Sequence, residues 1–194
     1  MKVGIIGSGG REHAICQSLK NSNKISKIFC FPGNAGTEDI AINIDLNLNN
    51  FEILKNFILD KKIDLIVIGP EKPLVDGLVD YLEKLKIKVF GPNKIASQLE
   101  GSKIFTKQLC EKFNIPTAKF GIFQSREDAK RFLNNSNFPL VIKADNLASG
   151  KGVYICHNKI ESYDAVDEIF NGKFGEAKNI LIEEYLEGEE MSFF

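Results

Sequence analysis

The sequence predicts an α/β protein in which a parallel sheet is followed by a smaller α+β unit. Three observations carry this prediction. Short apolar runs alternate with helical patterns over roughly the first hundred residues, as in parallel β-α-β units. Loops that contain glycine follow three of these runs, and a hairpin with a lysine-bearing loop comes later. At 194 residues and 43% hydrophobic content, the chain suits two small domains.

The first unit begins with a strand at 2–6 and a helix that carries Ala14, Ile15 and Leu19 at helical spacing. Its other elements are expected as strands at 28–31, 63–68 and 87–90 and helices at 51–60 and 74–85. The loops 7–10, 32–36 and 69–71 each follow a strand. Because the carboxyl ends of parallel strands meet at one edge of a sheet, these loops are expected to form a ligand site.

The first glycine loop departs from the NAD-binding fingerprint. Glu12 stands where a glycine is expected, and the strand at 28–31 ends in a proline instead of an acid that would hold the ribose. An NAD-dependent dehydrogenase is therefore disfavoured. The loop still offers the phosphate-binding geometry of a helix N-terminus.

The second unit begins near Gly101 and Ser102, which resemble a helix stop followed by an N-cap. Ser125 is expected to cap a helix whose Ala129, Phe132 and Leu133 face inward. The other elements are expected as helices at 95–113 and 161–170 and strands at 119–123, 140–142, 153–156 and 179–182.

Composition excludes several functions. The net charge of −1 without a basic stripe argues against nucleic acid as the main partner. No run approaches a membrane span of roughly 18 apolar residues, and no signal peptide is recognisable, so a cytoplasmic location is expected. The four scattered cysteines indicate reduced, buried thiols. With only two histidines, a zinc site or a Ser-His-Asp triad is disfavoured.

The hairpin loop combines small residues with positive charge. Ser149, Gly150 and Gly152 allow backbone N–H groups to face an anion, and Lys143 and Lys151 supply charge for phosphate oxygens. A nucleoside triphosphate is the ligand that this pattern favours. A surface hairpin with two solvated lysines is the structural alternative. A Walker loop is excluded, because glycine follows the Gly-Lys pair and a strand comes next.

The run 183–190 holds five carboxylates in eight residues. It is either a solvated acidic turn or a nucleotide-recognition segment. In the second interpretation, backbone beside Tyr185 and Leu186 pairs with an adenine edge, and one carboxylate accepts hydrogen bonds from ribose hydroxyls.

Seven motifs, in order along the whole chain, carry a family resemblance. They are Gly-Gly-Arg-Glu-His-Ala (9–14), Pro-Gly-Asn-Ala-Gly-Thr (32–37), Gly-Pro-Glu-Lys-Pro-Leu (69–74), Leu-Glu-Gly-Ser-Lys-Ile-Phe-Thr-Lys (99–107), Ile-Lys-Ala-Asp (142–145), Gly-Lys-Gly-Val (150–153) and Glu-Glu-Tyr-Leu-Glu-Gly-Glu-Glu (183–190). Together they closely resemble the phosphoribosylamine-glycine ligases, also called glycinamide ribonucleotide synthetases. The resemblance implies a Rossmann-like pre-ATP-grasp domain at 1–100 and an incomplete ATP-grasp domain at 101–194, with a linker helix at 101–118 and a small lobe at 119–190.

The resemblance also implies an activity in de novo purine biosynthesis. Glycine and ATP would form glycyl phosphate, which 5-phosphoribosylamine attacks to give glycinamide ribonucleotide, ADP and phosphate. ATP and Mg²⁺ are the implied cofactors, and glycine and 5-phosphoribosylamine the implied small-molecule substrates. Such chemistry requires charge stabilisation and positioning more than acid-base catalysis, so no catalytic residue is assigned.

Site residues follow from the matching motifs. Lys103 and Lys143 would hold the ATP phosphates. The remaining ATP contacts implied are the loop residues Ala148, Ser149, Gly150, Lys151 and Gly152, the adenine-side residues Glu183, Glu184 and Leu186, and Glu190 at the ribose. Gly9, Gly10, Asn34 and Glu71 would face phosphoribosylamine.

Some positions depart from the family pattern. Ser8 replaces the commoner Asn, and Asn146 and Ser149 replace Gly and Ala in the lysine loop, which is expected to alter loop stiffness without loss of function. The family continues beyond the point where this chain ends, so the Mg²⁺ ligands are expected in the missing part. No metal ligand is assigned here, and this piece alone is not expected to turn over.

Two other functions remain open. A different ATP-grasp ligase, such as a carboxylase subunit or another purine ligase, would share the lysines and the acidic run but not motifs 9–14 and 32–37. A non-catalytic nucleotide-binding module would bind ATP without glycine-dependent release of ADP.

Overall fold

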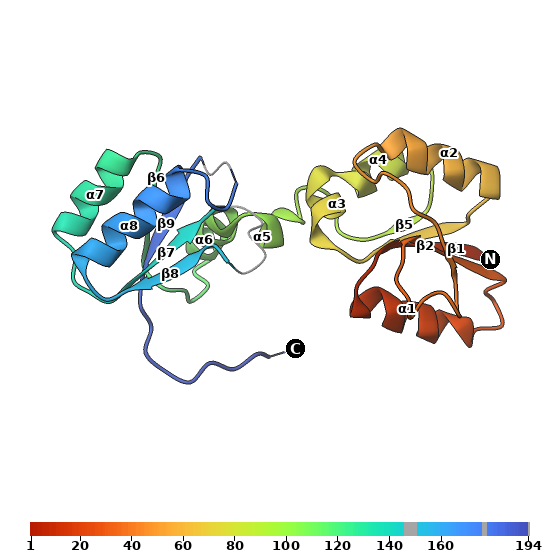
Figure 1. The fold of residues 1–194 in the computed structure, drawn as a ribbon, viewed down its shortest axis with the longest axis horizontal. Coiled ribbons are helices and arrows are strands. Elements are labelled where there is room, and N and C mark those ends of the chain that lie inside the picture. Colours follow the sequence, from red (N-terminus) through yellow and green to blue (C-terminus); the bar gives the residue numbers. More distant parts are fainter. Residues whose placement is uncertain (146–150, 176–177, 194) are drawn as a thin grey trace. The chain divides into compact units, whose positions relative to one another are not determined.

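The computed structural model describes residues 1–145, 151–175 and 178–193. The chain forms two compact units, Met1–Gln98 and Leu99–Phe194 (Figure 1). The first unit is built on a parallel sheet and the second on an antiparallel sheet with two covering helices. The predicted α/β fold class is confirmed.

A five-stranded parallel sheet forms the centre of the first unit, with strand order β3-β2-β1-β4-β5. Its strands are β1 (Lys2–Gly7), β2 (Lys27–Pro32), β3 (Ile42–Asn43), β4 (Leu65–Ile68) and β5 (Val89–Phe90), and its helices are α1 (Gly10–Lys20), α2 (Phe51–Lys61), α3 (Glu71–Asp76) and α4 (Leu78–Lys84). The order reverses at β1, which pairs with β2 on one side and β4 on the other. Ligands of such sheets bind where the carboxyl ends of these strands meet.

Helices cover both faces of this sheet (Figure 1). On one face, Cys16 of α1 packs against buried side chains of β1 and β2. On the other face, Leu54 of α2 and Leu78 of α4 belong to a cluster with Ile6 and Phe31. Because the inner strands β1, β2 and β4 are covered on both faces, they carry continuous apolar runs, as in β4 (Leu-Ile-Val-Ile).

The structure corrects three details of the first unit. The helix expected at 74–85 begins at Glu71 and is interrupted at Gly77, whose φ of +93° ends α3 in the left-handed region. Ala14, expected on the apolar face of α1, is exposed, and Glu12 is buried there instead. The two-residue strand β3 was not predicted, because two residues are too few to show a periodic pattern.

The second unit contains an antiparallel sheet of order β6-β9-β7-β8. Its elements are β6 (Phe120–Phe123), β7 (Leu140–Ala144), β8 (Val153–Cys156), β9 (Ile180–Glu184), α6 (Lys103–Lys112), α7 (Arg126–Asn134) and α8 (Lys159–Phe170), and the short α5 (Gln98–Gly101) precedes them. The predicted hairpin is confirmed, since β7 and β8 pair antiparallel with Lys143 opposite Val153.

Helices α7 and α8 cover one face of this sheet (Figure 1). Leu133 of α7 and Ile169 of α8 pack there against Ile142 and Ile182. Three helices of the unit begin at side-chain N-caps on Ser102, Ser125 and Asn158. The prediction that Phe132 faces inward is wrong, because this residue is 43% exposed. The centroid of its ring nevertheless lies 5.0 Å from that of the Phe123 ring.

Among the described residues, no helix combines the length and the apolar character that a bilayer crossing requires.

Candidate functional site

The face of the antiparallel sheet opposite α7 and α8 carries Lys143 and Glu183. Successive side chains of a strand point to opposite faces. Ile142 and Ile182 point into the core beneath α7 and α8, so Lys143 and Glu183 point to the other face. Glu183 is paired with Val141, which places it diagonally from Lys143 on the adjacent strand.

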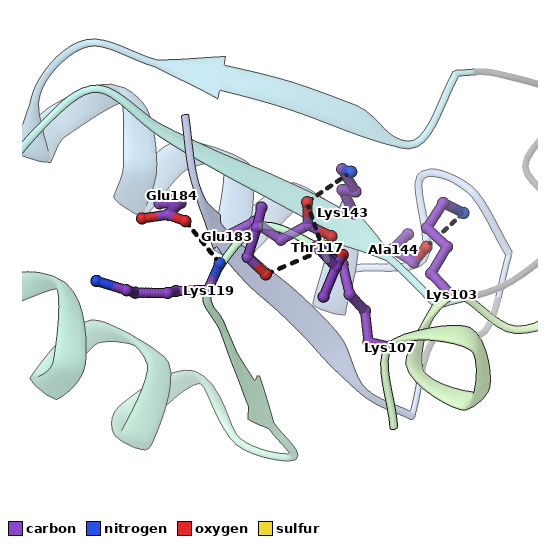
Figure 2. A network of polar contacts seen from close by, with 9 residues as sticks. Lys103, Lys107, Thr117, Lys119, Lys143, Ala144, Glu183 and Glu184 are labelled. Carbon is purple, nitrogen blue, oxygen red and sulfur yellow. Dashed lines mark hydrogen bonds and ion pairs between the residues drawn. The ribbon is translucent and has the colours of Figure 1, made fainter. Parts of the chain in front are cut away.

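Three lysines surround the Glu183 carboxylate or lie near it (Figure 2). Lys143 Nζ donates to Glu183 Oε2 at 2.8 Å, and Lys107 Nζ lies 3.4 Å from the same oxygen. Lys103 Nζ donates to the carbonyl of Ala144 at 3.0 Å. Ala144 is the residue that follows Lys143 in the chain. Lys103 and Lys107 are four residues apart on α6 and therefore share one face of that helix.

Asp145 connects the start of α6 to the end of β7. Its carboxylate accepts hydrogen bonds from Ser102 Oγ at 3.0 and 3.2 Å and from the backbone N–H of Ile104 at 3.1 Å. Ser102 Oγ in turn accepts from the N–H of Phe105. This arrangement brings Lys103 to the end of the strand that carries Lys143, although the two lysines lie forty positions apart in the sequence.

The cluster brings three ammonium groups close together among carboxylates. Lys103 lies near Asp145, Glu183 and Glu100 as well as near Lys143, and Lys107 and Lys143 pair with Glu183. Burial lowers the pKa of Lys103 from its ordinary value, and repulsion from Lys143 adds to this effect while attraction to Asp145 opposes it. A phosphate oxygen beside these ammonium groups would relieve the repulsion, so the arrangement suits an anionic ligand.

Glu183 is a buried carboxylate with unequal oxygens. Its side chain is 6% exposed, and its Oε2 pairs with the ammonium groups of Lys107 and Lys143. Oε1 is buried and has no hydrogen-bond partner among the described residues. Burial of a charge is tolerated when it is paired, and here Lys107 and Lys143 both pair with it.

Lys107 ends the motif at 99–107, but the sequence predicted no role for it. In the structure its ammonium donates to Thr117 Oγ1 at 2.7 Å and to the carbonyl of Ala118 at 3.2 Å, and lies 5.6 Å from the centroid of the Phe120 ring. Its side chain is 12% exposed. The four-residue spacing from Lys103 was the available signal that both share a helix face.

The other residues expected at ATP are placed differently. Glu184 extends the β6–β9 pairing: its Oε1 accepts from the N–H of Lys119 at 2.9 Å, and its own N–H donates to the carbonyl of Lys119. Leu186 and Glu190 are exposed beyond β9.

The hairpin loop is only partly within the described residues. The carbonyl of Gly152 accepts from the N–H of Ala144 at 2.9 Å, and Lys151 is exposed. The predicted contacts Ala148, Ser149 and Gly150 lie outside the described residues, as does the departure at Asn146.

In the first unit, the three predicted loops meet at the carboxyl ends of β1, β2 and β4. Asn34 links two of them: its Nδ2 donates to the carbonyl of Ser8 at 2.8 Å, while its Oδ1 accepts from the N–H of Gly36 at 2.8 Å. Arg11, for which the sequence predicted no role, donates to the carbonyl of Gly69, and its Nη2 lies 3.2 Å from Glu71 Oε1.

Glu12 fills the space between these loops. It is 4% exposed, and its Oε2 accepts from the N–H of Gly9 at 2.6 Å. A Cβ at Gly69 would lie 2.0 Å from Glu12 Oε1, and one at Gly7 would lie 2.7 Å from the Glu12 side chain. Gly7 and Gly69 must therefore be glycines, because any side chain there would collide with Glu12. Glu12 itself occupies the position at which the NAD-binding fingerprint has a glycine. Gly10 is exposed at the start of α1.

No group of three or more His, Cys, Asp or Glu side chains is arranged to hold a metal ion within 1–145, 151–175 and 178–193.

Family models match both units. The description "Phosphoribosylglycinamide synthetase, N domain" applies to residues 1–100, and "Phosphoribosylglycinamide synthetase, ATP-grasp (A) domain" to residues 101–194. The chain is 48% identical over 195 aligned residues to a phosphoribosylamine-glycine ligase of Brucella melitensis, covering 100% of this chain and 46% of that protein. It thus spans about half the length of the curated relatives it matches.

Solved structures agree with the fold. The crystal structure of a phosphoribosylamine-glycine ligase from Thermotoga maritima superimposes with a TM-score of 0.78 at 33% identity, over 97% of this chain and 45% of that one. The biotin carboxylase domain of the Hydrogenobacter thermophilus 2-oxoglutarate carboxylase, solved with MgADP, gives a TM-score of 0.75 at 23% identity, over 96% and 44% of the two chains. At that identity the second match concerns the fold alone.

Proposed function

The chain belongs to the phosphoribosylglycinamide synthetase family, and on that premise we propose that the protein carries out the ATP-dependent ligation of glycine to 5-phosphoribosylamine. The products are glycinamide ribonucleotide, ADP and phosphate, a step of purine biosynthesis. The match of both family models, end to end along the chain, carries this proposal.

The lysine cluster supports ATP as the ligand of the second unit. Lys103 and Lys143 lie together around the end of β7, where their ammonium groups repel one another. In the proposed reaction the carboxylate of glycine attacks the γ-phosphorus of ATP, and ADP leaves. The amine of phosphoribosylamine then attacks the acyl carbon of glycyl phosphate, and phosphate leaves. The two lysines would stabilise the charge on the phosphate oxygens and hold the nucleotide in position.

The remaining nucleotide contacts are proposed on the family resemblance. The segment 148–152 would fold over the phosphates, Glu183, Glu184 and Leu186 would border adenine, and Glu190 would accept hydrogen bonds from ribose. Leu186 and Glu190 are exposed in the segment that follows β9, the strand that carries Glu183, and this position supports the assignment.

The loops of the first unit are proposed to receive phosphoribosylamine. Gly10 lies exposed at the start of α1, where backbone N–H groups and the helix dipole favour an anion such as the ribose phosphate. The N–H of Gly9 and the amide of Asn34 are engaged in bonds within the loops, so their proposed contribution is to shape the site. Glu71 would be oriented by its pairing with Arg11.

Mg²⁺ enters the proposal only as the ion that accompanies ATP, where it would neutralise phosphate charge. The described residues do not present a metal-ligand group, so no step is assigned to the ion here. We expect its ligands in the half of the relatives that this chain does not span. We also propose that the domains divide between 100 and 101, and that the enzyme acts in the cytoplasm.

The test is release of ADP by the complete gene product, measured with a coupled assay. We expect turnover that requires both glycine and 5-phosphoribosylamine. Turnover with bicarbonate or formate in place of glycine would identify a different ATP-grasp ligase. Binding of ATP without any glycine-dependent ADP would indicate a non-catalytic nucleotide-binding protein. Either result would contradict the proposal.

A further inference from the structure

Lys107 and Lys143 both pair with Glu183, but their surroundings differ. The Lys107 ammonium has three donors, and three acceptor groups surround it: Thr117 Oγ1, the Ala118 carbonyl and Glu183 Oε2. Its side chain is 12% exposed, compared with 25% for Lys143. Lys107 is therefore held in place by fixed protein groups on a helix and on the segment that leads into β6.

Of the two lysines that pair with Glu183, Lys143 is the one more accessible to a ligand. It lies on β7 next to Ala144, whose carbonyl binds Lys103, and its ammonium pairs with Glu183. When a phosphate oxygen pairs with Lys143, the Glu183 carboxylate must share or give up that cation. A buried carboxylate without any counter-charge is strongly destabilising. Because Lys107 stays in contact with Glu183, the carboxylate remains paired when Lys143 turns to the phosphate.

We propose that Lys107 is a positioning residue of the nucleotide site, which serves as the permanent counter-ion of Glu183 and so leaves Lys143 available to the ligand's phosphates. This inference rests on the proposed ATP site. Lys107 itself does not touch the nucleotide. Without it, Lys143 is the one cation among the described residues that pairs with Glu183, and this carboxylate competes directly with phosphate for it.

Removing the Lys107 charge should weaken binding of phosphate-bearing ligands selectively. For Lys107→Met in the complete gene product, we expect the Kd of ATP and of ADP, measured by calorimetry, to rise about tenfold or more, since a charge-assisted contact is lost to competition. The Kd of adenosine should change less than about threefold, because adenosine has no phosphate. A purely structural role would weaken all three ligands together.

Second-site rescue separates competition from unfolding. In Lys107→Met/Glu183→Gln the competing carboxylate is gone, so Lys143 is released and ATP affinity should recover to within about threefold of the Glu183→Gln single variant. Lys107→Arg keeps the charge and should stay near wild type. Lys112→Met is the matched control: it removes an exposed lysine from the same helix, and should leave ATP affinity unchanged.

The outcomes are distinct. The inference is supported if Lys107→Met loses ATP but not adenosine affinity and the double variant recovers. It is overturned if ATP and adenosine affinities fall equally, if ATP affinity does not fall, or if removing the Glu183 charge gives no recovery. If the wild-type protein binds no ATP, the proposed function fails, and this inference fails with it.

Discussion

Replacing Asp145 with alanine should loosen the start of α6. Its carboxylate accepts two hydrogen bonds, from Ser102 Oγ and from the N–H of Ile104 at 3.1 Å. A hydrogen bond to a charged group contributes about 1.5–3 kcal/mol. Because Asp145 is half-buried, the lower part of that range applies, and we expect a loss of about 3–4 kcal/mol for the two bonds. Ser102 keeps its own bond to the N–H of Phe105, so the helix persists.

Hydrogen exchange measures this local effect directly. Peptides covering 103–112 should exchange at least about tenfold faster in Asp145→Ala, since about 1.4 kcal/mol corresponds to a factor of ten. Peptides covering 159–170, in α8, should exchange as in the wild type. Asp145→Asn retains one acceptor oxygen and should lose about half as much protection. The reasoning is refuted if exchange in α6 changes less than about threefold in Asp145→Ala, or if α8 loosens equally.

Three further predictions concern other parts of the chain. Gly69→Ala places a Cβ 2.0 Å from a buried carboxylate oxygen and should destabilise the first unit by about 1–3 kcal/mol in thermal unfolding, whereas Gly10→Ala, with open space around it, should not. Burial raises the pKa of Cys30 to about 12, so native-state alkylation followed by mass spectrometry should modify Cys110 far faster; equal rates would contradict this burial. The pKa of Lys103 is lowered, and phosphate binds its protonated form, so ATP affinity should be complete below that pKa and fall as the pH rises through it. Lys103→Arg, which stays charged, should remove this alkaline loss, and an unchanged pH profile would show that Lys103 does not hold phosphate.

Local features of the fold were predictable from sequence because they depend on neighbouring residues. The apolar run of β4 and the glycine after it identify a buried strand and its exit. Ser102 and Ser125 mark helix starts, and both accept the expected backbone hydrogen bonds. The resemblance to the ligase family is confirmed by both family models. Where the local signal was ambiguous, as at Gly77 inside an apolar helical pattern, the prediction failed.

The sequence by itself determined the order of the elements and the family, and it identified Lys103 and Lys143 as candidates for phosphate binding. Only the tertiary structure decided which charges meet. Lys143 and Glu183 lie forty positions apart, and their contact depends on the register of β7 against β9. Strand register is fixed by the packing of the core face, which then places every residue of the opposite face. In the sequence, Glu183 is one member of an acidic run, whereas in the fold it is buried and pairs with Lys107. The sequence did not predict this pairing, because contacts between distant residues leave no signal in local periodicity.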